Sequence, residues 1–258
     1  MNGGETDQEK RAEWRQSLES AILHQKIPIK AKTFLKGWRT KSEPVLLQCE
    51  DKNIYVVKGQ QAGRQIVNDQ IVARLGLAID APVGKAKIIY VSQELIDIEP
   101  NLSNFIAGTA HGTQFIPDCF DQWELIATSE PDNRPRLARL AVLYGWTYAN
   151  DHQFLFQNSP PRLIYSVDHG HFFPNGPEWQ EDDLKHASSA GIDPILSSTC
   201  NFTANELKEA LEKLERVTED DIIHVVAVPP QEWQLTMEER ITMVEYLTRR
   251  QQELLELL

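Results

Sequence analysis

The sequence predicts an α+β fold of two lobes, with a small β-rich N-terminal lobe and a mainly helical C-terminal lobe. Short β-branched and apolar runs separated by turn residues dominate the first part of the chain, whereas helical apolar patterns with capping motifs fill the last third. The 258 residues suffice for one domain or for two lobes that share a cleft. We expect an N-terminal helical extension over 1–25, an N-lobe over 26–118 and a C-lobe over 119–258.

In the N-terminal half, the predicted elements are a strand over 44–48, a strand over 53–57 that Lys58 closes, a helix over 65–77 and a strand over 85–91. Turn residues between the first two strands predict a hairpin. The extension is predicted to be a charged helix that docks through Trp14, Leu18 and Ile22, which recur at a spacing of four. Residues 92–135 are rich in proline and glycine, and we interpret them as an irregular stretch that connects the lobes near 115–120.

In the C-terminal half, the predicted elements are a helix over 136–148, strands over 154–156 and 163–167, and an amphipathic closing helix over 236–258. The two strands flank the turn-like Asn158–Pro161 and predict a second hairpin. Thr203 with Glu206, and Thr236 with Glu239, fit the capping box that begins a helix.

Composition and charge narrow the class of protein. The 41% of apolar and 25% of charged residues are typical of a globular chain, and no apolar run approaches a membrane span. The polar start lacks an export signal, and Cys49, Cys119 and Cys200 lack paired metal spacing, so we expect a cytoplasmic protein with no membrane partner. The net charge of −12 argues against general nucleic-acid binding. The cationic segment Lys30–Lys41 is either a solvated strand edge or a phosphate-facing segment.

Two carboxylates flank the second hairpin. Asp151 stands in a polar stretch before its first strand, and Asp168 follows its second strand, where Gly170 is expected to turn the chain sharply. Such a pair can hold magnesium and accept a proton from a hydroxyl, as phosphoryl transfer requires. Asp151 is also compatible with a structural Asx turn.

A lysine and an acid in the first half could complete this site. Lys58 at a strand end can pair with nucleotide phosphates, and Asp69 on the following helix can orient the lysine. Taken alone, the two residues are more often an ordinary ion pair than part of a nucleotide site. A competing interpretation is a zinc or transition-metal site for hydrolysis, built from His152, Asp168, His169 and His171, but no second acid cluster completes it.

Taken together, these motifs resemble the HipA-like kinase family, which has a two-lobed protein-kinase-like fold. The resemblance is carried, in order, by Tyr55–Lys58, Ile66–Leu77, Ala107–Phe115, Asn150–Gln153, Ser166–Pro174 and Val228–Trp233. Each motif is loose by itself, whereas their shared order is more specific. The resemblance extends from about residue 28 to the end of the sequence.

The resemblance implies an ATP- and magnesium-dependent phosphotransferase, most simply a serine/threonine protein kinase. Lys58 would contact the ATP phosphates, Asp69 would orient Lys58, Asp151 would be the catalytic base and Asp168 would bind magnesium. Gly37 would begin a segment that closes over the phosphates, although no Gly-x-Gly-x-x-Gly is present. The expected partners are the nucleotide and a protein substrate of unknown identity, and small-molecule acceptors such as aminoglycosides or inositides remain open.

The sequence departs from the family pattern at two places. Asp69 is one methylene shorter than the usual glutamate. The asparagine expected about five residues after the catalytic aspartate, where it holds a second magnesium, is replaced by Phe156. Gln153 or Asn158 could substitute as the metal ligand, and we favour Gln153. The alternative function is therefore a pseudokinase, a module that binds a nucleotide or a partner without turnover.

Overall fold

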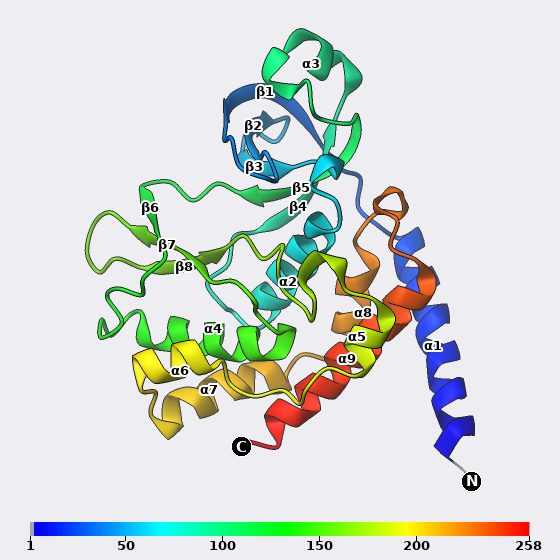
Figure 1. The fold of residues 1–258 in the computed structure, drawn as a ribbon, viewed down its shortest axis with the longest axis vertical. Coiled ribbons are helices and arrows are strands. Elements are labelled where there is room, and N and C mark those ends of the chain that lie inside the picture. Colours follow the sequence, from blue (N-terminus) through cyan, green and yellow to red (C-terminus); the bar gives the residue numbers. More distant parts are fainter. Residues whose placement is uncertain (1–2, 258) are drawn as a thin grey trace.

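The computed structural model describes residues 3–257, with side chains from residue 8 onward. It confirms the two-lobed α+β fold: a small β-barrel lies at one end of the molecule and most of the helices lie at the other (Figure 1). Between them lie a three-stranded sheet and helix α2 (Gln65–Ala78). The lobe boundaries expected after residues 25 and 118 stay a prediction.

Five strands form the barrel: β1 (Ile29–Gly37), β2 (Val45–Cys49), β3 (Ile54–Lys58), β4 (Ala86–Val91) and β5 (Gly108–Gln114). They pair in the order β1-β2-β3-β5-β4, and a parallel pairing of β1 with β4 closes the barrel. Apolar side chains from the strands fill the interior, and α3 (Gln93–Ile98) adds Leu95 to this core. The predicted hairpin and the strand after it are thus confirmed as β2, β3 and β4.

The structure overturns part of the interpretation of residues 92–135 as irregular. This stretch contains α3, a 3₁₀ helix at Pro100–Leu102, β5 and β6 (Cys119–Gln122). The sequence of β5 has few apolar residues, and its extended form comes from pairing with β3 on one side and β4 on the other. Gly112 is required there because a side-chain carbon at its position would overlap Ile89.

Strand β1 corrects the interpretation of Lys30–Lys41 as a strand edge. Its backbone pairs with β2 on one side and β4 on the other, so β1 is an interior strand of the closed barrel. The side chains of Lys30, Lys32 and Lys36 are exposed to solvent. These three lysines therefore lie on the outside of the barrel.

The helical lobe contains α4 (Arg134–Thr147), α5 (Glu181–Lys185), α6 (Pro194–Cys200), α7 (Ala204–Glu215), α8 (Glu219–Ala227) and α9 (Met237–Leu255). The predicted second hairpin is confirmed as β7 (Gln153–Gln157) and β8 (Ile164–Val167), and β6 pairs with the outer side of β7. Both predicted capping boxes are confirmed, at Thr203 for α7 and Thr236 for α9. These caps fix where the helices begin because they satisfy backbone amides that have no partner inside the helix.

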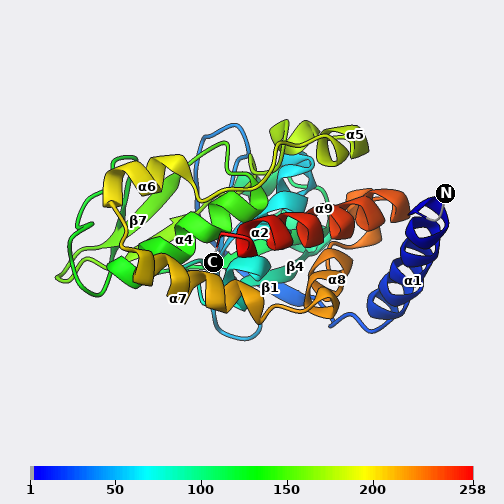
Figure 2. The same ribbon diagram turned by 90° about the horizontal axis from the view of Figure 1, so that it is seen from below.

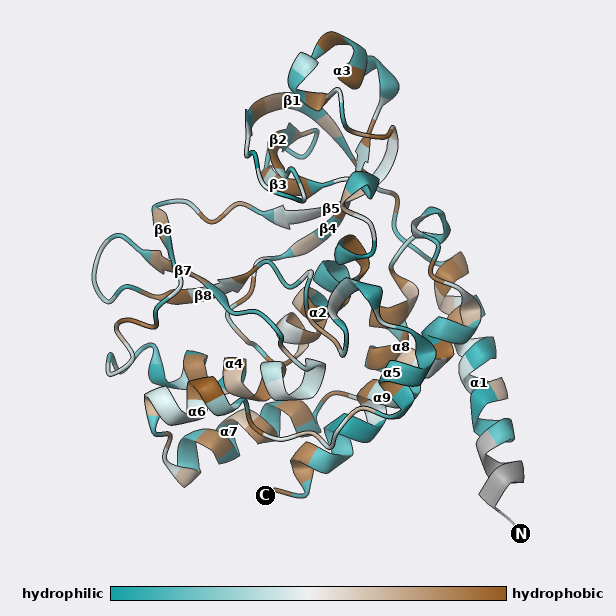
Figure 3. Ribbon diagram, viewed as in Figure 1, coloured by the Kyte–Doolittle hydropathy of each residue, from teal (hydrophilic) through white to brown (hydrophobic). Residues whose placement is uncertain are grey.

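The apolar side chains form two separate cores. One fills the barrel, and the other, larger core joins α4, α7, α8, α9 and the β7–β8 hairpin. The buried apolar residues of α2, among them Ile66, Ile71 and Leu75, belong to the larger core. In Figure 3 hydrophobic segments accordingly gather on α2, α4 and α8, while α1 and α5 are largely hydrophilic. Helix α2 thus packs as part of the helical lobe, although it lies between barrel strands in the sequence.

Helix α1 (Gly3–Leu23) lies along α8 and α9 at the edge of the molecule (Figure 2). Trp14 and Leu18 are buried in the larger core, as predicted, and Ile22 packs against it. Ion pairs of Lys10 with Glu219 and of Arg11 with Glu238 flank this apolar contact. Of the helices within residues 3–257, none is long and apolar enough to cross a membrane.

Candidate active site

The Lys58 ammonium joins three elements at the boundary of the two lobes. Its Nζ atom lies 2.8 Å from Oδ2 of Asp69 on α2 and 2.6 Å from Oδ1 of Asp168 just after β8. The side chains of Lys58 and Asp69 are 7% and 4% exposed, whereas that of Asp168 is 38% exposed. The cluster therefore has a closed inner side and an open side at Asp168.

Burial and charge oppose each other in this cluster. Burial alone would lower the pKa of Lys58, but the carboxylates of Asp69 and Asp168 outweigh it and hold this pKa above its ordinary value. Burial would likewise raise the pKa of Asp69, but the Lys58 ammonium holds it below its ordinary value. Both groups are therefore charged near neutral pH, and each needs the other because an unpaired charge at this depth is costly.

Two buried histidines flank the ion pairs. His111 lies directly opposite Lys58 in the β3–β5 register, and His169 follows Asp168. Burial lowers the pKa of each imidazole to about 4; the charge of Asp69 opposes this shift and that of Lys58 adds to it. Both rings are therefore neutral above that pH.

Hydrogen bonds fix the orientation of both rings. The Gln70 amide, oriented so that its oxygen accepts from Arg74, donates to Nδ1 of His111 at 2.8 Å. His111 Nε2 then donates to Thr113 Oγ1 at 2.8 Å. Nε2 of His169 shares a 2.8 Å hydrogen bond with Ser166 Oγ. These contacts hold α2, β5 and the end of β8 around the ion pairs.

The β7–β8 register brings the segment of Asp151 close to that of Asp168. Gln153, two residues after Asp151, pairs directly with Val167, the residue before Asp168. The side-chain amide of Asn150 donates to the carbonyl of His171 at 3.0 Å and to that of Phe173 at 2.6 Å. The half-buried Asp151 is thus held by a rigid strand on one side and by Asn150 on the other.

The same register separates the two predicted substitutes for the missing asparagine. Phe156 is fully buried in the larger core and cannot reach a ligand. Asn158 follows the far end of β7, about five residues and roughly 17 Å along the strand from Gln153. The suggestion of Asn158 as a metal ligand beside Asp168 is therefore wrong, whereas Gln153 pairs with the residue before Asp168.

Gly37 lies at the end of the barrel that carries Lys58. It pairs with Val45 of β2, and Val45 pairs with Val57, which precedes Lys58. The turn that follows Gly37 holds exposed Arg39 and Lys41. The register is thus compatible with a turn that closes over a ligand at Lys58, and this role of Gly37 stays a prediction.

The expectation that Gly170 turns the chain sharply after Asp168 is wrong. Its backbone is not left-handed, and Asp168 itself adopts that conformation, with φ 58°. A side-chain carbon at Gly170 would lie 2.9 Å from Cβ of Gln65 on α2. The glycine therefore allows the Asp168 segment to pack closely on α2.

The proposed zinc set does not converge. His152 Nε2 contacts Asp193 at 3.1 Å, whereas His169 Nε2 contacts Ser166. Within residues 3–257, no group of three or more histidine, cysteine, aspartate or glutamate side chains is arranged to hold a metal ion. All three cysteines are free thiols.

Sequence reasoning missed Asn68, His111, Asn150 and Asp193, which orient the site rather than form its charged centre. One signal for Asn68 was available. Four polar residues of α2 (Gln65, Asn68, Asp69 and Gln70) are all buried, so polar residues lie on the inner side of a mainly apolar helix. Polar residues at such positions must have partners, which marks the helix as part of a site.

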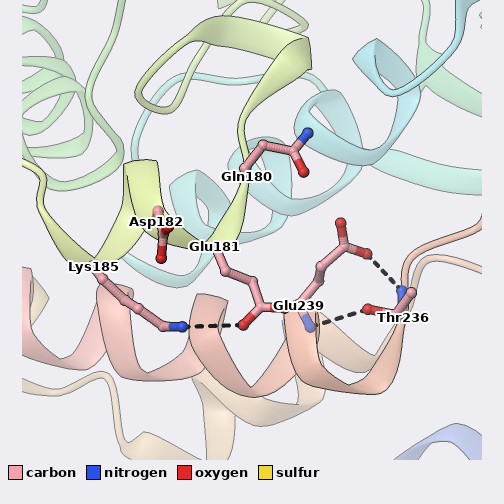
Figure 4. A pocket seen from close by; sticks show the side chains of 6 residues that line it. All are labelled: Gln180, Glu181, Asp182, Lys185, Thr236 and Glu239. Atoms are coloured by element: carbon pink, nitrogen blue, oxygen red, sulfur yellow. Dashed lines mark hydrogen bonds and ion pairs between the residues drawn. The ribbon is translucent and has the colours of Figure 1, made fainter.

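Two hollows lie away from this cluster. The one in Figure 4, about 460 Å³, lies between α5 and the start of α9 and is lined by Glu181, Lys185 and Glu239 among others. The other, about 660 Å³, lies between the end of α1 and the start of α9. Neither is lined by Lys58, Asp69, Asp151 or Asp168, so the candidate site rests on the contacts of Lys58 with Asp69 and Asp168 and on the strand register that brings the Asp151 segment near Asp168.

The barrel, the central helix and the lysine–aspartate cluster define a protein-kinase-like fold. Among solved structures, the chain is similar to the Helicobacter pylori proinflammatory kinase CtkA (TM-score 0.58, 11% identity, 89% of this chain and 96% of that chain). It is also similar to the Golgi casein kinase crystallised with Mn/ADP (TM-score 0.51, 12% identity, 93% of this chain and 76% of that chain). At these identities the likeness shows the fold alone.

The sequence matches the HipA-like kinase family over residues 36–258. The chain therefore belongs to the HipA-like kinase family, and the predicted resemblance is confirmed. No curated protein sequence matches it.

The two buried histidines predict a defined dependence of stability on pH. Each has a folded pKa of about 4 against 6.5 for the free group, so between these values the unfolded chain binds more protons. The contribution of the two histidines to the free energy of unfolding is fully present above pH 6.5. It falls as the pH drops toward 4, with a limiting slope of about 1.4 kcal/mol per pH unit for each histidine. Urea unfolding measured from pH 7.5 to 4 tests this. We expect His111→Gln to reduce the slope by about half, and a flat profile in the unmodified protein would contradict neutral, buried imidazoles.

Proposed function

We propose that this protein is an ATP- and magnesium-dependent phosphotransferase that phosphorylates a hydroxyl group, most simply a serine or threonine of another protein. The single observation that carries the proposal is the position of the Lys58 ammonium, within 2.8 Å of Asp69 and 2.6 Å of Asp168, in a member of the HipA-like kinase family. A buried lysine held by one enclosed and one open carboxylate is suited to receive a phosphate on the open side.

Nucleotide binding would use the open side of the cluster. The ammonium of Lys58 would contact phosphate oxygens while Asp69, which is almost fully buried, continues to orient it. Arg39 and Lys41 in the turn after Gly37 would add positive charge above the phosphates. Similarity to a kinase crystallised with Mn/ADP supports a nucleotide bound with a divalent cation.

The oxygen atoms present fit magnesium. Asp168 contacts Lys58 through Oδ1 only, and its partial exposure leaves Oδ2 for a cation. Gln153, half-buried and paired with Val167, the residue before Asp168, would supply an amide oxygen for a second cation in place of the missing asparagine. Carboxylate and amide oxygens suit this hard cation, which would offset the negative charge of the phosphates.

Transfer would use Asp151 as the base. One of its oxygens, Oδ1, already accepts from the backbone amide of His152 at 2.8 Å, which orients the carboxylate. The other oxygen of Asp151 would accept the proton of the attacking hydroxyl. At the same time the hydroxyl oxygen would bond to the γ-phosphorus, and the bond from this phosphorus to the ADP oxygen would break. Asn150 and the start of β7 would keep this oxygen in place.

We propose that this protein is cytoplasmic and that its phosphate acceptor is another protein. The net charge of −12 disfavours a nucleic-acid partner in general, and the free thiols of all three cysteines accord with a reducing compartment. Small-molecule acceptors such as aminoglycosides or inositides would use the same charged groups, Lys58, Asp151 and Asp168, with Asp69 orienting the lysine.

A pseudokinase is the second candidate, and one observation favours it. The family asparagine is replaced by the fully buried Phe156, so that binding of a second cation depends on Gln153. A weaker second site would leave nucleotide binding intact while it slows transfer. Binding and transfer therefore have to be measured separately.

Nucleotide binding depends on the Lys58 ammonium in both candidates. We expect the double variant Lys58→Met, Asp69→Asn, which leaves no unpaired buried charge, to lose about tenfold or more in affinity for ATP with magnesium, because a phosphate contact to an ammonium is lost. Isothermal titration calorimetry measures this. Lys52→Met, at an exposed lysine of the β2–β3 turn, is the control and should bind normally. Equal affinity in all three proteins would remove the proposed nucleotide site.

Transfer should require the carboxylate of Asp151. We expect Asp151→Asn to lower phosphate transfer from labelled ATP, to a general protein substrate or to itself, by about 10²–10⁴-fold while nucleotide affinity changes little, because only proton transfer is affected. Asp121→Asn, at the exposed position of β6, is the control. If the unmodified protein binds ATP but transfers no phosphate under these conditions, the pseudokinase is the correct candidate.

The metal requirement should depend on Gln153 and not on Gln157, which lies on the same face at the other end of β7. We expect Gln153→Ala to raise the magnesium concentration needed for half-maximal nucleotide binding or transfer, by about tenfold, since one ligand oxygen is lost. A magnesium titration at fixed nucleotide measures this. Gln157→Ala should behave like the unmodified protein, and an equal shift in both variants would assign the effect to the strand rather than to a ligand.

A further inference from the structure

The side chain of Asn68, next to Asp69 on α2, is fully buried and uses both of its polar atoms. Its amide nitrogen lies 2.9 Å from the carbonyl oxygens of Gly170 and Phe172 and 3.3 Å from that of Gly176. Its oxygen accepts from Nε1 of Trp179 at 3.0 Å. Every one of these partners lies in the segment that follows Asp168.

Further contacts hold the same segment on α2. The guanidinium of Arg64, at the start of α2, lies 4.1 Å from the centre of the Trp179 ring and forms a 2.6 Å ion pair with Glu239 of α9. At the other end of the segment, Gly170 packs closely against Gln65. The segment 170–179 is thus attached to α2 at both ends and at its middle, with Asn68 at the centre.

The packing of α2 explains why this attachment matters. Its apolar residues belong to the core of the helical lobe, and the barrel has a core of its own. Asp69 and Asp168 therefore both stand on the helical lobe, whereas Lys58 comes from the barrel. Movement between the lobes would separate Lys58 from both carboxylates together, while the distance between the two carboxylates stays fixed.

We propose that Asn68 is a positioning residue that fixes Asp168 relative to Asp69, so that one ammonium can reach both and the open oxygen of Asp168 faces the bound cation. This inference rests on the proposed function, since the cation arrives with the nucleotide. The role needs an amide: the nitrogen donates to the carbonyl oxygens and the oxygen accepts from the indole, a combination that neither aspartate nor leucine of similar size provides.

Asn133 provides a matched control. It is also fully buried, donates to two carbonyl oxygens (Ala127 at 3.1 Å and Arg162 at 3.0 Å) and accepts from the backbone amide of Ile164 at 3.0 Å. Ala127 lies between β6 and α4, and Arg162 and Ile164 lie at the end of the β7–β8 hairpin away from Asp168. Replacing either asparagine by alanine removes similar buried hydrogen bonds, so both changes should destabilise the fold.

The experiment compares nucleotide affinity in excess magnesium with affinity in a chelator for the unmodified protein, Asn68→Ala and Asn133→Ala. Magnesium raises nucleotide affinity by a certain factor, the magnesium gain. We expect this factor to be roughly 10–100-fold smaller in Asn68→Ala than in the unmodified protein, as is typical when a group that orients a metal ligand is removed. Affinity in chelator should change much less, and Asn133→Ala should keep the full gain. If Asn68→Ala folds too poorly, Trp179→Phe keeps the ring over Arg64, removes the hydrogen bond to Asn68 and should show a smaller loss of the same kind.

Hydrogen exchange of the unliganded proteins is the second measurement. Amides of residues 169–179 should exchange faster in Asn68→Ala and not in Asn133→Ala. A full magnesium gain in Asn68→Ala, or equal losses in both alanine variants, would overturn the proposal while the proposed function stands. If the unmodified protein binds no nucleotide with magnesium, the proposed function fails and the positioning role fails with it. Faster exchange in Asn68→Ala would then show that Asn68 only holds residues 169–179 on α2.

Discussion

The buried charge of Lys58 is the constraint on which the arrangement of this protein depends. An ammonium at such depth is tolerable only with anionic partners in contact, and here these come from two other elements, α2 and the end of β8. The barrel, the central helix and the hairpin must therefore meet at one point. Two carboxylates contact one ammonium, so the cluster carries an excess of negative charge. Under the proposed function, a phosphate chain would be repelled unless it arrives with its cation.

Helix α2 connects this electrostatic constraint to the packing of the lobes. It carries Asp69 toward the barrel lysine, yet its apolar side packs into the helical lobe, and its polar residues are satisfied by β5 on one side and by the segment after Asp168 on the other. The lobe boundary in space therefore does not follow the order of the chain. The two neutral histidines lie at this boundary. Burial lowers the pKa of each imidazole by more than the charge of Asp69 raises it.

The sequence was informative where structure is set locally. The β2–β3 hairpin, α2, α4, the β7–β8 hairpin and the capped helices α7 and α9 follow from short-range patterns, and the order of Lys58, Asp69, Asp151 and Asp168 indicated the family. Sequence patterns failed where pairing between distant segments determines the structure. β5 has few apolar residues and is extended because β3 and β4 lie beside it, and β1 becomes an interior strand only through its pairing with β4. The polar positions of α2 are a signal for Asn68, but its role could not be assigned because its partners lie about a hundred positions away.

Helix α1 has a consequence for how the chain assembles. Its partners on α8 and α9 come more than two hundred residues later, as the separations of Lys10 from Glu219 and of Arg11 from Glu238 show. Helix α1 is made before α8 and α9 and finds its binding surface only after both have been made, since closing so long a loop precedes any gain from the contact. Until then Trp14 and Leu18 lack the core that buries them, so α1 is expected to dock in a late step of folding.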